Sequence, residues 1–70
     1  MAAKDQFARN LVEQRRRRGL SQDDLAELAG MHRTAISLLE RRGRDPRLET
    51  IVKLAHALGV KPITLMRGIE

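Results

Sequence analysis

The sequence predicts one all-α domain, built from five short helices and spanning residues 1–70. Apolar residues recur at helical spacing in every segment, and no segment shows the polar and apolar alternation that is typical of a strand. Glycine follows three of these apolar stripes, at places where helices commonly end. The hydrophobic content of 41% is ordinary for a globular fold, and 70 residues suffice for only one small core.

The first helix is predicted from about Ala3 to Arg18. Phe7, Leu11 and Val12 form a narrow apolar stripe along it. Gly19 is expected to end this helix, because glycine readily adopts the left-handed conformation of a helix C-terminus.

The second helix is predicted from about Gln22 to Ala29. Ser21 precedes it as an N-cap, and Asp24 stands three residues later, which is the spacing of a capping box. Asp23 and Glu27 suit the positive end of the helix dipole. The apolar residues of this helix are expected to be buried: Leu25, Ala26, Leu28 and Ala29.

A third helix is predicted from about Arg33 to Arg41, after a tight turn at Gly30. Helices joined by such a turn cross steeply, so small residues are needed where they touch. Ala26 supplies a small residue, and a substituent at Gly30 would resist the positive φ that the turn requires. This spacing is typical of a helix-turn-helix. The side chains expected to face inward are Ala35, Ile36 and Leu39.

The last two helices follow a loop with the sequence RRGRDPR, which Pro46 closes. A fourth helix is predicted from about Leu48 to Leu58, and Gly59 ends it. Pro62 suits the first turn of a short fifth helix that reaches about Arg67. The fourth helix is expected to bury Leu48, Ile51, Leu54, Ala55 and Leu58.

The outer face of the third helix forms one stripe, opposite Ile36 and Leu39, that contains no acidic residue. The residues of this stripe are Arg33, Thr34, Ser37, Leu38 and Arg41. Arginine can span guanine O6 and N7, hydroxyl groups can bond to base edges, and leucine can contact a thymine methyl. The stripe therefore predicts base contacts by Arg33, Thr34, Ser37 and Leu38. The alternative is a solvated face of accidental composition.

Three stretches of the sequence, "RGLSQDDLAELAG", "ISLLE" and "DPRLETIVKLAHALGV", resemble the Cro/CI-type, or Xre-like, helix-turn-helix family. The resemblance extends from Arg15 to about Gly68. The family includes small phage repressors and restriction–modification controller proteins. It implies a five-helix lambda-repressor-like domain whose third helix enters the major groove, and hence a transcriptional regulator.

The resemblance also implies roles for individual residues. Gln22 matches a glutamine that holds a DNA phosphate, and a helix N-terminus is itself an anion site. Arg15 and Glu40 match an ion pair that ties the first helix to the end of the third. This pair is expected to be structural, so that Glu40→Ala destabilises the fold.

The sequence departs from the family pattern at two places. His32 stands where a serine or threonine commonly caps the third helix, so either the turn shifts or His32 points at a phosphate. Arg42 precedes Gly43 where the family commonly has glycine, which leaves the end of the third helix open.

The charge balance points to an anionic partner. Fourteen Lys and Arg face nine Asp and Glu, giving +5, and eleven of the fourteen are arginine. Nucleic acid is expected first, with a membrane surface or an acidic protein behind it. Phe7 is the only aromatic residue, so duplex is favoured over single strands. The expected phosphate contacts are Gln22, His32, Arg41, Arg42, Arg44 and Arg17, the last from an arginine run that also suits a helix C-terminus.

The remaining composition excludes several classes of function. No cysteine is present, and His32 and His56 stand far apart, so no metal site is expected. No nucleophile with a base and no phosphate-binding glycine loop occurs, which argues against an enzyme and against a cofactor. No apolar run reaches the length of a membrane span. The absence of cysteine fits the reducing cytoplasm.

The C-terminal segment carries more apolar residues than a chain end needs: Ile63, Leu65, Met66 and Ile69. Some of them must cover the core, and the excess predicts a homodimer that reads two half-sites of a near-palindromic duplex. The main alternative is a protein-interaction module, such as an antitoxin, in which DNA binding is secondary. A basic helix on a membrane surface ranks last, because the first helix has few bulky apolar residues.

Overall fold

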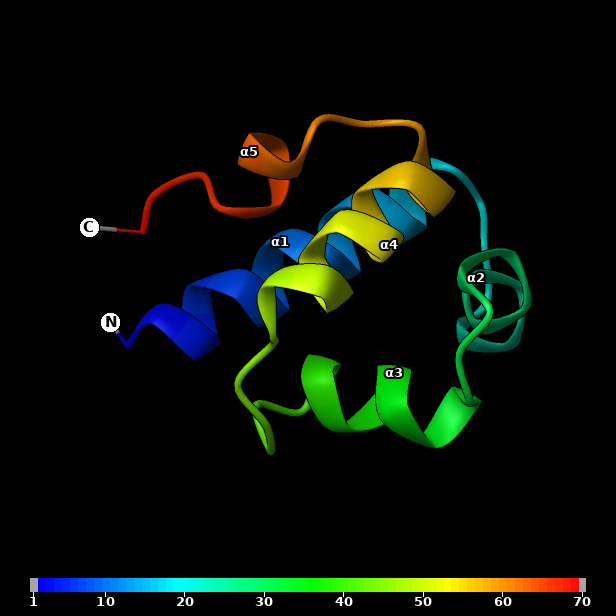
Figure 1. Ribbon diagram of the computed structural model, residues 1–70, viewed down its shortest axis with the longest axis horizontal. Coiled ribbons are helices and arrows are strands. Elements are labelled where there is room, and N and C mark those ends of the chain that lie inside the picture. Colours follow the sequence, from blue (N-terminus) through cyan, green and yellow to red (C-terminus); the bar gives the residue numbers. More distant parts are fainter. Residues whose placement is uncertain (1, 70) are drawn as a thin grey trace.

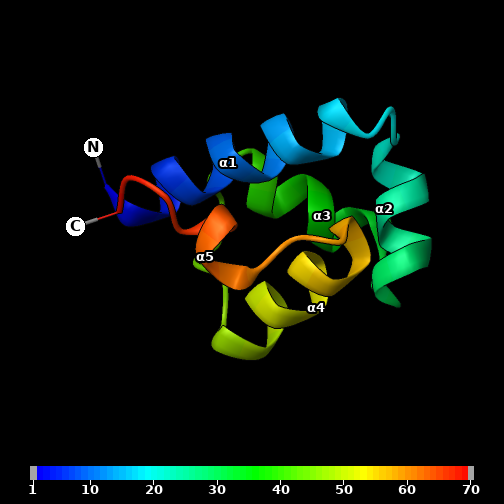
Figure 2. The same cartoon turned by 90° about the horizontal axis from the view of Figure 1, so that it is seen from above.

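A computed structural model describes residues 2–69 as an all-helical fold without strands. The expected all-α fold with five helices is confirmed (Figure 1). The helices are α1 (Ala3–Arg17), α2 (Gln22–Ala29), α3 (Arg33–Glu40), α4 (Leu48–Leu58) and α5 (Pro62–Leu65). α3 packs against α1 and α2, and α4 packs against α2 and α5. Figure 2 shows α5 between α1 and α4, whereas α3 lies on the opposite side of the molecule from α5 in Figure 1.

Every helix contributes to one hydrophobic core. The largest fully buried side chains are Phe7, Leu11, Leu25, Ile36, Leu54 and Leu65. The core residues of α1 and those of α4 repeat at the spacing of one helix face. The amphipathic pattern of the sequence therefore turns one face of each helix toward a shared core. The core positions α2 and α3 against each other, and their outer surfaces stay in solvent.

Three helix ends differ from the sequence-based prediction. α1 ends at Arg17 rather than Arg18, and α3 ends at Glu40 rather than Arg41, which are ordinary one-residue differences. α5 ends at Leu65 and does not reach Arg67. Beyond it the chain turns more tightly, because the Ile69 amide donates to the Met66 carbonyl.

Several predicted core residues are not buried. Leu28 is 58% exposed, because the inward face of α2 is made by its neighbours Leu25 and Ala26. Leu48 is 78% exposed, since it is the first residue of α4 and nothing packs over that end. Val12 is only half-buried.

The prediction for Leu65 was wrong in the opposite direction, because this residue is buried. It was expected at a dimer interface, yet its relative exposure is 0%. It packs into the core of its own chain with Phe7 and Leu58 among the buried residues, so it cannot contact a second copy.

A buried amide ties the two ends of the described chain together. Asn10 of α1 donates from Nδ2 to the carbonyl oxygens of Leu65 at 2.9 Å and Arg67 at 2.8 Å. Its Oδ1 accepts from Gln6 Nε2 at 3.0 Å. Buried polar groups are costly unless they are hydrogen-bonded, and Asn10 meets this condition while fixing the end of α5.

Candidate nucleic-acid interface

The N-terminus of α2 is formed by the capping box that the sequence predicted. Ser21 Oγ accepts from the Asp24 amide at 3.0 Å, and Asp24 Oδ2 accepts from the Ser21 amide at 2.9 Å. These bonds stabilise the charged carboxylate, so the pKa of Asp24 lies below its ordinary value of 3.8. The capping box fixes where α2 starts, and Gln22 is the first residue of the helix.

The turn between α2 and α3 depends on a left-handed glycine. Gly30 has a φ of +66°, and the Met31 amide donates to the Ala26 carbonyl at 2.9 Å. Ala26 and Ile36 are buried where the two helices cross. Because a Cβ at position 30 would be strained in this conformation, glycine and the small Ala26 together set the angle at which α3 leaves the turn.

α3 presents the predicted stripe to solvent. Arg33, Thr34 and Arg41 are exposed, whereas Ser37 and Leu38 are partly buried. His32 is the N-cap residue of α3, with an extended backbone and no side-chain capping hydrogen bond. The turn therefore keeps its normal cap geometry without a serine or threonine, and the imidazole is exposed at the end of α3.

A buried ion pair joins α1 to the end of α3 behind this stripe. Arg15 of α1 donates from Nε and Nη2 to the two carboxylate oxygens of Glu40 at 2.7 and 3.0 Å. Arg15 Nη1 also donates to the Leu20 carbonyl at 2.8 Å. The hydrogen bond to Glu40 raises the pKa of Arg15 above its ordinary value.

The same carboxylate also reaches α2. Gln22 Nε2 donates to Glu40 Oε1 at 3.0 Å, so Gln22, Arg15 and Glu40 form one network. The side chains of Arg15 and Glu40 are only 12% and 5% exposed. This network holds the start of α2 against the end of α3, and the amide oxygen of Gln22 accepts none of these bonds.

The backbone at Arg42 shows how α3 ends without a glycine at the position where the family commonly has one. The Gly43 amide donates to the Leu38 carbonyl at 2.8 Å, and Arg42 occupies the left-handed position of this helix-ending motif with a φ of +66°. Within residues 2–69, Arg42 is the only residue other than glycine with positive φ. Gly43, one position later, does not have the left-handed conformation that would require glycine.

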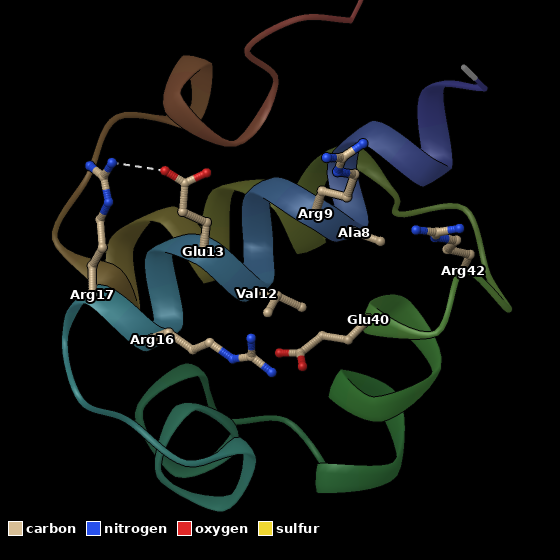
Figure 3. A pocket seen from close by; sticks show the side chains of 8 residues that line it. All are labelled: Ala8, Arg9, Val12, Glu13, Arg16, Arg17, Glu40 and Arg42. Carbon is tan, nitrogen blue, oxygen red and sulfur yellow. Dashed lines mark ion pairs between the residues drawn. The ribbon is translucent and has the colours of Figure 1, made fainter.

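A basic hollow lies between α1 and the end of α3 (Figure 3). It is lined by Ala8, Arg9, Val12, Glu13, Arg16, Arg17, Glu40 and Arg42. Arg17 pairs with Glu13 at 2.8 Å, and Arg42 pairs with Asp5 at 3.8 Å. Figure 3 shows Arg16 extending from α1 toward Glu40. Two predicted phosphate contacts, Arg17 and Arg42, therefore share this hollow.

The other predicted site residues lie elsewhere. Gln22, His32, Arg33 and Thr34 belong to the N-terminal ends of α2 and α3. Arg41 and Arg44 are exposed after α3. Sequence reasoning treated Asp23 only as a favourable first-turn charge.

The structure places Asp23 Oδ1 3.5 Å from Arg33 Nε, across the turn. This pairing has no signal in the local sequence, because it depends on the angle between α2 and α3.

Residues 2–69 contain neither a metal site nor a membrane-spanning helix. No group of His, Asp or Glu side chains is arranged to hold a metal ion there. None of the helices between residues 2 and 69 is long and apolar enough to span a bilayer.

Comparisons with known proteins agree with this geometry. A family model described as Helix-turn-helix matches residues 11–65. The control protein C.SmaI from Serratia marcescens is 43% identical over 58 residues, covering 83% of this chain and 69% of that protein.

Solved structures give a similar result. The restriction-modification controller protein C.AhdI from Aeromonas hydrophila superposes with a TM-score of 0.88 at 40% identity, covering 93% of this chain and 98% of that one. A hypothetical transcription factor, NHTF, from Neisseria superposes with a TM-score of 0.89 at 35% identity, covering 93% and 75%.

Proposed function

Since the chain belongs to the Helix-turn-helix family of transcriptional regulators and is not an enzyme, we propose that it recognises a specific duplex operator as a homodimer. The operator is near-palindromic, and each copy places α3 in the major groove of one half-site. The protein regulates transcription from that site, as its similarity to controller proteins suggests. We also propose that it acts in the cytoplasm, where a bacterial or phage regulator meets its DNA.

The stripe on the outer side of α3, exposed at Arg33 and Thr34 and partly buried at Ser37 and Leu38, is the observation that carries this proposal. Arg33, Thr34, Ser37 and Leu38 can contact base edges through hydrogen bonds and one apolar contact. The stripe contains no carboxylate that would repel phosphates. The glycine turn and the Glu40 network hold α3 rigidly, so these side chains reach a groove without a large loss of conformational freedom.

Phosphate contacts supply the affinity. Gln22 lies at the N-terminus of α2, where backbone amides and the helix dipole favour an anion. Its Nε2 has a second N–H, besides the one donated to Glu40, that can bond to a phosphate oxygen. We propose that exposed cations around α3 add sequence-independent attraction. These are Arg41, Arg42, Arg44 and, from the end of α1, Arg17, and the exposed His32 can donate a hydrogen bond to a phosphate beside them.

Exposed apolar side chains on α4 and α5 support the homodimer. Leu48 and Val52 of α4 are exposed, and Ile63 and Met66 lie exposed at α5, which packs on α4. Ile69 is half-buried against the core, so only the exposed part of its side chain can contact a second copy. A 70-residue chain buries little surface by itself, so covering these side chains with a second copy would add stability.

DNA binding is tested with duplex from upstream of the protein's own gene and with random-sequence duplex, over a series of salt concentrations. Arg33→Ala and Ser37→Ala should each lose most of the preference for the specific site. Arg33→Ala should lose about five- to 150-fold, the value of a good bidentate base contact. Lys53→Ala removes a charge from the exposed side of α4 and should keep the preference. If both α3 variants select the site as strongly as the natural protein, the proposed function is wrong.

Dimer formation is tested by sedimentation at tens of micromolar. Ile63→Lys should dissociate the dimer, because it places a charge among the exposed apolar side chains of α4 and α5. Leu28→Lys is the matched control, since Leu28 is also exposed but lies on α2. A natural protein that sediments only as a monomer would contradict the homodimer and would favour another protein as the partner of these side chains.

A further inference from the structure

Asp23 and Arg33 form an ion pair that crosses the turn between α2 and α3. Asp23 lies in the first turn of α2, and Arg33 is the first residue of α3. Their 3.5 Å contact joins Asp23 Oδ1 to Arg33 Nε, and the side chains are 77% and 63% exposed. Because Gly30 and the buried crossing fix the two helices, this proximity follows from the fold.

The contact uses one edge of the Arg33 guanidinium. Arginine carries five N–H donors in a planar fork, and the carboxylate faces Nε. The edge formed by Nη1 and Nη2 is the one that can then bond to guanine O6 and N7 together. A carboxylate at this position can therefore fix the plane of the fork without blocking the atoms that read the base.

The negative charge of Asp23 repels DNA phosphates, so it does not add to the general attraction of the protein to DNA. Asp24, beside it, forms the capping box, but Asp23 takes no part in those bonds. Asp23 also stands next to Gln22, for which we propose a phosphate contact. In water, an exposed ion pair such as this one contributes little stabilisation. Once the groove excludes water, the attraction between the two charges strengthens, and so does the repulsion between Asp23 and the phosphates.

We propose that Asp23 is a specificity-determining residue that positions Arg33. It holds the guanidinium toward a base edge and keeps it from turning to the neighbouring phosphates, which an unrestrained arginine would contact at any sequence. Asp23 thus lowers affinity for DNA in general and raises selectivity for guanine at one position of each half-site. The inference rests on the proposed function, since it requires α3 to enter the groove.

The test measures affinity of full-length variants for three kinds of duplex. The first is the site that the natural protein selects from a randomised pool. The second is a set of single-base changes at the position where Arg33→Ala loses discrimination. The third is random-sequence duplex. Asp23→Ala should bind random duplex more tightly, while its preference for guanine at that position falls about threefold to tenfold.

Glu27→Ala is the matched control. Glu27 is an exposed carboxylate on the same helix, and its removal changes the net charge by the same amount. It should tighten binding to random duplex and keep the guanine preference. Asp23→Asn separates charge from shape, and it should lose the preference to a smaller degree than Asp23→Ala. Thermal unfolding of each variant checks that the fold is kept.

The outcomes separate this inference from the proposed function. If Arg33→Ala loses discrimination and Asp23→Ala keeps it, the role of Asp23 is refuted and the proposed function stands. If the natural protein shows no preference over random duplex, both are refuted. In an Arg33→Ala background, Asp23→Ala should change the preference no further. A change there would mean that Asp23 does not act through Arg33, which would also overturn the inference.

Discussion

Replacing Glu40 with alanine should cost the domain about 3 to 5 kcal/mol of unfolding free energy, the range for removing one partner of a buried ion pair. Glu40 accepts two hydrogen bonds from Arg15 and one from Gln22. Because only 12% of the Arg15 side chain is exposed, its charge would lose most of its compensation with the carboxylate. The free energy of unfolding of a domain of this length is about 4 to 10 kcal/mol in total, so the loss is severe.

The measurement is urea and thermal unfolding of Glu40→Ala beside Glu13→Ala. Glu13 pairs with Arg17 at 2.8 Å, but these side chains are 55% and 65% exposed, and such a pair within one helix contributes only about 0.3 to 0.5 kcal/mol. Glu40→Ala should therefore lower the midpoint of thermal unfolding by at least about 12 °C, and Glu13→Ala by only a few degrees.

A second variant keeps the test valid where Glu40→Ala does not fold. Arg15→Met combined with Glu40→Leu removes both charges and fills their volume, which should recover most of the lost stability. The reasoning is refuted if Glu40→Ala unfolds within about 1 kcal/mol of Glu13→Ala. It is also refuted if the double variant is no more stable than Glu40→Ala.

Three further predictions concern the helix ends. Arg42→Gly should stabilise the fold by about 1 kcal/mol in thermal unfolding, because glycine relieves the left-handed conformation; an unchanged midpoint would contradict this. The pKa of Asp24, measured by NMR, should lie below 3.8, and it should rise only part of the way toward 3.8 in Ser21→Ala, because the backbone amide of residue 21 still donates to the carboxylate in that variant. Because this pKa is lower in the folded chain, the stabilisation is complete above pH 3.8 and is lost as the pH falls through the folded value. Asn10→Ala should cost about 1 to 3 kcal/mol and speed hydrogen exchange near Leu65, since two carbonyls lose their donor; exchange rates like those of the natural protein would argue against the bond.

The boundaries of α2 could be predicted because the residues that set them act locally. Ser21 and Asp24 cap α2 through bonds within four residues, and Gly30 ends the same helix by its own conformation. Neither depends on how distant parts of the chain pack. The exposed face of α3 was predictable for a related reason, since the spacing of Ile36 and Leu39 determines which side is opposite the core.

The burial of particular leucines could not be predicted in the same way. Helical spacing defines a face, but the coverage of that face depends on where neighbouring helices begin and end. Leu48 shares the phase of the α4 core residues and still lies beyond any neighbour, whereas Leu65 is covered completely. Leu28 lies on the side of Leu25 away from Ala26, so it stands off the face that Leu25 and Ala26 turn toward the core.

Parts of the candidate site also required the tertiary structure. The sequence showed that Arg42 replaces a glycine, but only the backbone shows that Arg42 itself adopts the left-handed conformation. The bond from Gln22 to Glu40 and the pairing of Asp23 with Arg33 join residues brought together by the helix crossing. Such contacts have no periodic signature, because they depend on the angle between two elements.

The amide of Asn10 has a consequence for the order of events in assembly. Its bonds to the carbonyls of Leu65 and Arg67 close loops of 55 and 57 residues, which are among the most costly contacts for a searching chain to make. The segment carrying Ile63 and Met66 is therefore secured only when nearly all of the fold is in place. In the homodimer proposed above, pairing through this segment would therefore follow the folding of each copy.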